Sequence, residues 1–203
     1  MIHKKDNFSK QISTLIPRLR RYAIVLTTIK EDAEDLLQAT LERAINKQHQ
    51  WQENTHLDRW SFTIMSSIWK NEIRSRSTRQ GNGITDNVQT LIDNHSIKSM
   101  EETLLRNQVF KEVMNLSVNH RKVVLLVYVE GLKYQEAADI LAISPGTLMS
   151  RLARARIALA KKLSGTDKEQ ISNVIELKED KAKKGLSYMI TGAIDNNDLN
   201  AVH

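Results

Sequence analysis

The chain has 203 residues, a formal net charge of +6 and no cysteine, and only 5% of its residues are aromatic. Without cysteine it forms neither disulfides nor thiolate zinc sites, and its 6 His residues lack the spacing of metal ligands, so we expect no metal and no cofactor. No apolar run approaches the ~18 residues that span a bilayer, and the start resembles no signal peptide. We therefore expect a soluble, cytoplasmic protein without membrane insertion, and 7 Gly and 2 Pro favour an all-α fold.

The positive charge is concentrated in two parts of the chain. Residues 1–80 hold 14 Lys/Arg against 9 Asp/Glu, and residues 118–163 hold 8 against 3, whereas residues 81–117 hold 3 against 5. Two basic lobes joined by a mildly acidic connector are the pattern expected if both lobes touch phosphate.

An amphipathic helix is predicted from Phe8, because apolar residues recur at helical spacing as far as Leu26. Pro17 lies within it, so that the helix either kinks there or ends near Ile16 and restarts. A second helix follows from about Glu31, whose acidic first turns are favoured by the helix dipole. Its polar stripe extends beyond those turns, through Asp35, Gln38 and Glu42, and could contact the basic residues of a partner.

A long helix is predicted from about Thr55 to Arg76, after a polar loop that carries Trp51. One face of this helix is apolar. The other is polar and should point outward; it comprises Arg59, Thr63, Ser66, Ser67, Lys70 and Arg74 and runs into Arg76 and Arg79. Basic, hydroxyl-rich strips suit single-stranded or melted nucleic acid, where bases stack on side chains. We expect Trp60 and Trp69 in the core and Trp51 to be the more exposed tryptophan.

The segment 80–99 has two Gly, several Asn, Asp and Ser and no aromatic residue, which predicts a flexible linker between two small helical domains. The second domain should begin near residue 100, with a helix apolar at Leu105, Val109, Val113 and Leu116. The next helix is expected to be capped by Asn119 and to end at Gly131. Residues 164–203 form a tail for which we expect partial disorder.

The stretch from Tyr134 to Leu163 has the pattern of a helix-turn-helix. A short helix, Tyr134 to Leu141, is followed by a turn in which Ser144 suits the N-cap and Pro145 the first helical position. The second helix then has two faces. Its apolar stripe is Leu148, Leu152, Ala155, Leu159 and Leu163, and its polar stripe is Thr147, Ser150, Arg151, Arg154 and Lys161.

This polar stripe has the geometry that reading of the DNA major groove requires, because Arg binds guanine edges while Ser and Thr bind phosphates or bases. A solvated amphipathic helix would show a similar stripe. The capped turn and the small Ala positions occur together with it here, which favours DNA binding. We expect Arg151 to lie nearer the bases than Arg154, because it follows Thr147 by one turn.

Two stretches together resemble the extracytoplasmic-function (ECF) group of bacterial RNA polymerase sigma factors. They are DAEDLLQATLERA with the later RWSFTIM, and HRKVVLLVYVEGLKYQEAADILAISPGTLMSRLARAR after the linker. The resemblance implies a region 2-like domain over residues 8–79, which binds core polymerase and melts the minus-ten element. It implies a region 4-like domain over residues 100–163, which binds the minus-thirty-five element of promoter DNA.

The resemblance also assigns residues to these surfaces. The polymerase-binding helix would use Asp35, Leu36, Gln38, Leu41 and Glu42. The minus-ten strand would face Trp51, Ser66, Lys70, Asn71, Arg74 and Arg76. The minus-thirty-five groove would face Tyr134, Gln135, Pro145, Gly146, Thr147, Ser150, Arg151 and Arg154. An anti-sigma factor is the further partner that the resemblance implies.

Ala142 departs from the family, which often has Gly at this turn, so the turn must form either without a residue of positive φ or with strain. Two alternatives stay open. One is a stand-alone helix-turn-helix regulator, which leaves the basic strip of the Thr55 to Arg76 helix unexplained, and the other is a sigma mimic that titrates an anti-sigma factor. An enzyme is not expected, since no carboxylate pair, phosphate loop or activated nucleophile is found.

Overall fold

The computed structural model describes residues 2–52, 55–80 and 108–163. Every element in these ranges is a helix, as predicted. The chain divides into two compact units. Most of the predicted linker, and all of the tail after residue 163, lie outside the described residues.

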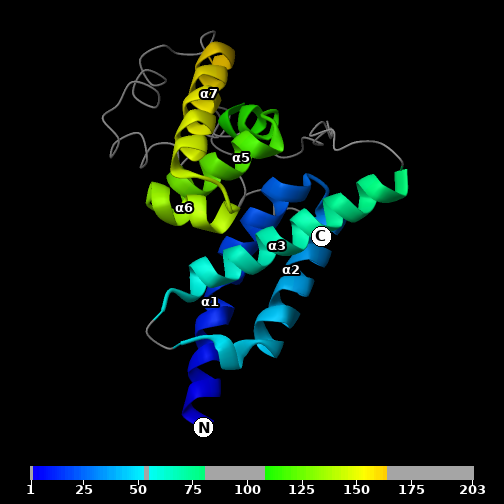
Figure 1. Ribbon diagram of the computed structural model, residues 1–203, viewed down its shortest axis with the longest axis vertical. Helices are drawn as coiled ribbons and strands as arrows, with labels where there is room; N and C mark the ends of the chain where they lie inside the picture. Colours follow the sequence, from blue (N-terminus) through cyan, green and yellow to red (C-terminus); the bar gives the residue numbers. More distant parts are fainter. Residues whose placement is uncertain (1, 53–54, 81–107, 164–203) are drawn as a thin grey trace, which may run out of the picture. The chain divides into compact units, whose positions relative to one another are not determined.

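The first unit consists of three helices that all contact one another (Figure 1). They are α1 (Ile2–Thr27), α2 (Lys30–Asn46) and α3 (Leu57–Gln80), with the short 3-10 turn η1 (Gln48–Gln50) between the last two. α1 continues through Pro17 as a single helix. The alternative of two helices separated at Ile16 is therefore wrong.

The core of this unit is formed where the apolar faces of the three helices meet. Tyr22, Phe62 and Met65 are fully buried, and the Tyr22 and Phe62 rings meet edge to face with centroids 5.2 Å apart. The Tyr22 hydroxyl forms a 2.8 Å hydrogen bond with the Ser66 hydroxyl, and burial raises the Tyr22 pKa above its ordinary value. The phenol therefore stays neutral and ties α1 to α3.

In the second unit, a helix whose described part covers residues 108–114 precedes α5 (Val118–Val124). The buried Arg121 donates a 2.8 Å hydrogen bond to the Met114 carbonyl, which joins the two helices, and burial lowers its pKa to about 10. α5 continues into one turn of π-helix, η2 (Leu125–Val129). Gly131 then ends the helix at φ +68°, as predicted, and the Leu132 N–H closes the cap on the Leu126 carbonyl at 3.0 Å.

The helix-turn-helix has the predicted boundaries. α6 spans Tyr134–Leu141 and α7 spans Pro145–Leu163. Ser144 is the N-cap: its hydroxyl accepts a 3.1 Å hydrogen bond from the Thr147 N–H. Ala142 takes φ +51°, so the turn is made with a strained alanine where glycine would fit without strain.

Candidate nucleic-acid interface

The buried side of α7 determines which of its residues face outward. Leu148, Leu152, Ala155 and Leu159 are at most 4% exposed, which confirms the predicted apolar stripe as far as the structure describes it. The exposed side carries Ser150, Arg154, Arg156, Lys161 and Lys162. α7 contains five basic and no acidic residues, so its outer face attracts a polyanion.

Arg151 is held from the side by α5. Its guanidinium donates a 3.2 Å hydrogen bond to the Asn119 side-chain oxygen, and the residue is only partly exposed, whereas Arg154 is exposed. The expectation that Asn119 caps α5 is wrong, because Ser117 occupies the N-cap position. Asn119 instead lies one residue inside the helix, where its amide fixes Arg151.

His120 also faces this group. Its pKa is lowered by partial burial and then by the positive charges of Arg151 and Arg154. The imidazole is therefore neutral at pH 7. The local sequence pattern indicates only an ordinary surface or cap residue, since the contact joins positions thirty or more residues apart in the chain.

The other predicted residues of the helix-turn-helix lie around the turn. Gln135, Pro145 and Gly146 are exposed, Tyr134 and Thr147 are half-buried, and the Thr147 hydroxyl lies 2.8 Å from that of Ser144. Two apolar residues of α7 that lie outside the predicted apolar stripe, Met149 and Ile157, are exposed.

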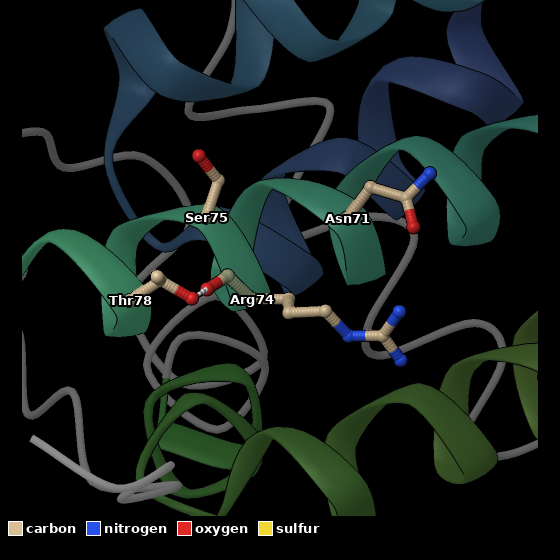
Figure 2. A pocket seen from close by; sticks show the side chains of 4 residues that line it. All are labelled: Asn71, Arg74, Ser75 and Thr78. Carbon is tan, nitrogen blue, oxygen red and sulfur yellow. Dashed lines mark hydrogen bonds between the residues drawn. The ribbon is translucent and has the colours of Figure 1, made fainter.

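A polar strip of exposed side chains runs along α3, and we call it the α3 strip. It consists of Thr63, Ser67, Lys70, Asn71, Arg74 and Thr78. Figure 2 shows its second half, where a shallow depression is lined by Asn71, Arg74, Ser75 and Thr78. The Arg74 side chain extends along the helix toward Asn71, while the Thr78 hydroxyl donates a 2.9 Å hydrogen bond to the Arg74 carbonyl. Among the described residues no carboxylate pairs with the Arg74 guanidinium, which leaves it available to an anion.

The three tryptophans of the first unit differ from the prediction in their burial. Trp51 is 2% exposed and packs against Phe8 with ring centroids 5.6 Å apart, so the expectation that it is the exposed tryptophan is wrong. Trp60 and Trp69, expected in the core, are half-buried and lie at its edge.

Two further residues expected to face the minus-ten strand are engaged within the unit. Ser66 is turned toward Tyr22. Arg76 pairs with carboxylates of its own unit. Neither side chain therefore belongs to the α3 strip.

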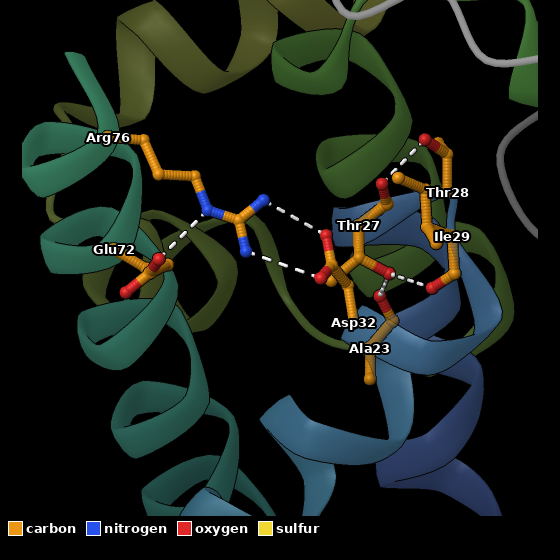
Figure 3. A network of polar contacts seen from close by, with 7 residues as sticks. All are labelled: Ala23, Thr27, Thr28, Ile29, Asp32, Glu72 and Arg76. Carbon is orange, nitrogen blue, oxygen red and sulfur yellow. Dashed lines mark hydrogen bonds and ion pairs between the residues drawn. The ribbon is translucent and has the colours of Figure 1, made fainter. Parts of the chain in front are cut away.

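The Arg76 contacts form a network between α2 and α3 (Figure 3). Its guanidinium binds both oxygens of Asp32, at 3.0 and 3.3 Å, and donates a 2.8 Å hydrogen bond to Glu72. It also lies over the Trp69 ring, 5.6 Å from its centroid. These carboxylates, Asp32 first, raise the Arg76 pKa. The geometry therefore gives Arg76 a positioning function between two helices.

On α2 the predicted polar stripe is exposed: Asp35, Gln38 and Glu42 all face solvent, with a 2.9 Å hydrogen bond from Gln38 to Glu42. Leu41 is half-buried, and Ile45, one turn further on, is 49% exposed. Leu36 is only 5% exposed and belongs to the core, so little of its side chain is accessible for the expected contact with a partner.

Within the described residues, no three His, Asp or Glu side chains are arranged to hold a metal ion. None of the described helices has a stretch long and apolar enough to cross a membrane.

Comparison with known families matches both units. Residues 12–66 match the model described as the Sigma2 domain of PhyR, and residues 107–159 match Sigma-70, region 4. The ECF RNA polymerase sigma factor SigL of Mycobacterium tuberculosis is 32% identical over 142 residues, which cover 70% of this chain and 80% of SigL. The chain belongs to the ECF RNA polymerase sigma factors.

Two further similarities agree with the assignment of this chain to the ECF sigma factors. The ECF RNA polymerase sigma factor EcfG of Rhodopseudomonas palustris is 29% identical over 156 residues, covering 76% of this chain and 84% of EcfG. Among solved structures, the sigma factor RpoE of Bartonella quintana, crystallised with the anti-sigma factor NepR, superimposes with a TM-score of 0.61 at 28% identity. That superposition covers 79% of this chain and 98% of RpoE.

Proposed function

We propose that this sigma factor uses three separate surfaces when it binds core RNA polymerase and directs initiation at promoters. The exposed stripe of α2 binds polymerase, the α3 strip binds the melted minus-ten strand, and the outer face of α7 reads the minus-thirty-five element. The single observation that supports DNA reading most strongly is the composition of α7, which has five basic residues and no acidic residue.

For the minus-thirty-five element, Arg154 and Ser150 are the proposed base-reading residues, because both are exposed on the first three turns of α7. Arg151, expected from the sequence to lie nearer the bases, is only partly exposed and binds Asn119, so we propose Arg154 as the nearer base reader and Arg151 as a residue beside it. Thr147, Pro145 and Gly146 lie at the helix N-terminus, where backbone N–H groups suit phosphate, and Tyr134 and Gln135 start the preceding helix.

For the minus-ten element, the proposed contacts are Lys70, Asn71 and Arg74. Their side chains are exposed along one line of α3, and Thr78 extends it by a further turn. A strip of cationic and amide groups follows a phosphate backbone well. Because Trp51 is buried, base stacking by that ring is not proposed.

For core polymerase, the proposed contacts are Asp35, Gln38 and Glu42, with Leu41 and Ile45 as the apolar part of the same surface. Exposed acidic residues beside an exposed isoleucine fit a basic partner with an apolar patch.

The protein acts as a non-catalytic initiation subunit in the cytoplasm, where polymerase acts. An anti-sigma factor is the further proposed partner, since the similar RpoE was crystallised with NepR. We further propose the domain limits expected from the sequence: two domains over residues 8–79 and 100–163, a linker over 80–99 and a tail over 164–203. Separate expression of residues 8–79 and 100–163 tests these limits, and cooperative unfolding of each fragment is the expected result.

The test of the assignment compares variants of two surfaces in holoenzyme. Lys70→Ala with Arg74→Ala is expected to leave closed-complex formation nearly intact and to reduce promoter opening. Arg154→Ala is expected to weaken closed-complex binding and to relax preference at one minus-thirty-five position, by about ten-fold or more for a base-reading Arg. Thr14→Ala, on an exposed part of α1, is the control for both. If both sets of variants kept parental opening and preference, the assignment would be wrong; a sigma mimic, which does not read DNA, would give this result.

A further inference from the structure

Two large apolar side chains lie exposed on α7, the helix proposed to read DNA. Met149 is 53% and Ile157 is 70% exposed, and Ala153, midway between them, is half-buried. At 100° per residue these three positions lie within about 80° of one another, so they form one apolar strip along the helix. This strip adjoins the polar residues Ser150 and Arg154.

The surroundings of the strip decide what kind of partner it fits. α7 carries five basic and no acidic residues, and Arg156, seven positions after Met149, lies almost in line with it. An apolar strip that lies between arginines and a serine fits a negatively charged polymer that also exposes an apolar group. In the major groove of DNA, that group is the C5-methyl of thymine.

We propose that Met149 contacts the C5-methyl of one thymine in the minus-thirty-five element and gives the promoter its preference for that base there. The inference rests on the proposed function of α7. Met149 is the fifth residue of α7, in the N-terminal part that enters the groove in helix-turn-helix proteins, whereas Ile157 lies two turns further on. The unbranched thioether adapts its shape to the methyl group. Its neighbour Ser150 donates a 2.9 Å hydrogen bond to the Thr147 carbonyl, so its hydroxyl oxygen can still accept from a polar base edge.

The test removes one methyl group at a time from the DNA. A minus-thirty-five sequence selected from a library with parental holoenzyme is resynthesised with deoxyuridine in place of each thymine in turn, on either strand. Parental holoenzyme is expected to bind about four-fold more weakly at one position, which is the effect of one buried methyl group. Met149→Ala is expected to bind the thymine promoter more weakly by a similar factor and to show no loss with deoxyuridine at that position.

Two variants make the result specific. Met149→Leu keeps an apolar side chain and is expected to keep the deoxyuridine loss, while Ile157→Ala is expected to keep the whole parental profile. Because Met149 and Ile157 are exposed, neither change is expected to unfold the protein, and urea unfolding of each variant checks that directly.

The outcomes separate this inference from the proposed function. If Arg154→Ala relaxes base preference but Met149→Ala retains every parental deoxyuridine effect, or if no position responds in the parent, the Met149 contact is wrong and the DNA-reading function of α7 stands. If neither variant changes affinity or preference, both proposals are wrong.

Discussion

The Arg76 guanidinium of α3 donates two hydrogen bonds, of 3.0 and 3.3 Å, to the two carboxylate oxygens of Asp32 on α2. This contact joins the helix proposed to bind polymerase to the end of the helix proposed to bind the minus-ten strand. It explains why an arginine that follows a basic strip in the sequence does not extend that strip in space. From the sequence alone, Arg76 would be counted among the residues of the minus-ten surface. In the structure it fixes α3 against α2.

We therefore expect Arg76→Gln to lower the free energy of unfolding by about 0.5–1 kcal/mol, a small effect because both side chains are partly exposed. Arg74→Gln is the matched control, two positions earlier on the same helix but without a carboxylate partner among the described residues, and it should change stability by less than ~0.5 kcal/mol. Urea unfolding measures both. Equal losses for the two variants would contradict the positioning function of Arg76.

Asp35 and Gln38 test the polymerase surface. Asp35→Ala with Gln38→Ala is expected to weaken binding to core polymerase while costing less than ~0.5 kcal/mol of stability, because both side chains are exposed. Thr63→Ala with Ser67→Ala, two exposed positions on the α3 strip, should leave polymerase affinity unchanged. Titration of core polymerase with labelled protein measures the difference, and parental affinity for the Asp35 and Gln38 variant would refute this surface.

Ala142 offers a test of backbone strain. Its φ of +51° costs an L-alanine about 1–2 kcal/mol, whereas glycine adopts this conformation freely. Glycine also raises the entropy of the unfolded chain, and after this cost is subtracted, Ala142→Gly should stabilise the protein by about 0.5–1 kcal/mol. Ala153→Gly, inside α7, should destabilise it by about 1 kcal/mol. A loss of stability in both variants would show that the turn is not strained.

His120 predicts a pH dependence. Its folded pKa lies below its ordinary value of 6.5, so between these two pH values the unfolded chain binds more protons than the folded one. The stability that depends on neutral His120 is present above pH 6.5 and is lost as the pH falls through the folded pKa. His120→Gln should therefore lose less stability than the parent when the pH is lowered from about 7 to about 5.5. Identical pH profiles of the unfolding midpoint would contradict this.

The helix-turn-helix can be predicted to the residue because its signals are local. Ser144, Pro145 and the spacing of Leu148, Leu152 and Leu159 each act within one or two turns of helix. The strain at Ala142 can also be predicted locally, because alanine replaces the glycine that such a turn favours. Ala142 does adopt positive φ.

Contacts between distant parts of the chain cannot be predicted in this way. Trp51 lies in a polar loop of the sequence, and only the packing of α1 shows that Phe8 covers it. Asn119 has the residue type of a cap, but the cap is Ser117, and the contact of Asn119 with Arg151 spans 32 positions. Periodicity tells which face of a helix is apolar; it does not tell which polar residue a neighbouring helix will engage.

The measurement that tests the central claim most directly is transcription from fragmented genomic DNA by core polymerase with and without this protein. The protein should produce transcripts with defined 5′ ends that are absent with core polymerase alone, and their upstream sequences should share two short elements. The Lys70 and Arg74 double variant and the Arg154 variant should each remove most of these transcripts. If the protein added no new start sites, or if neither variant affected them, the assignment of these surfaces to promoter recognition would be contradicted.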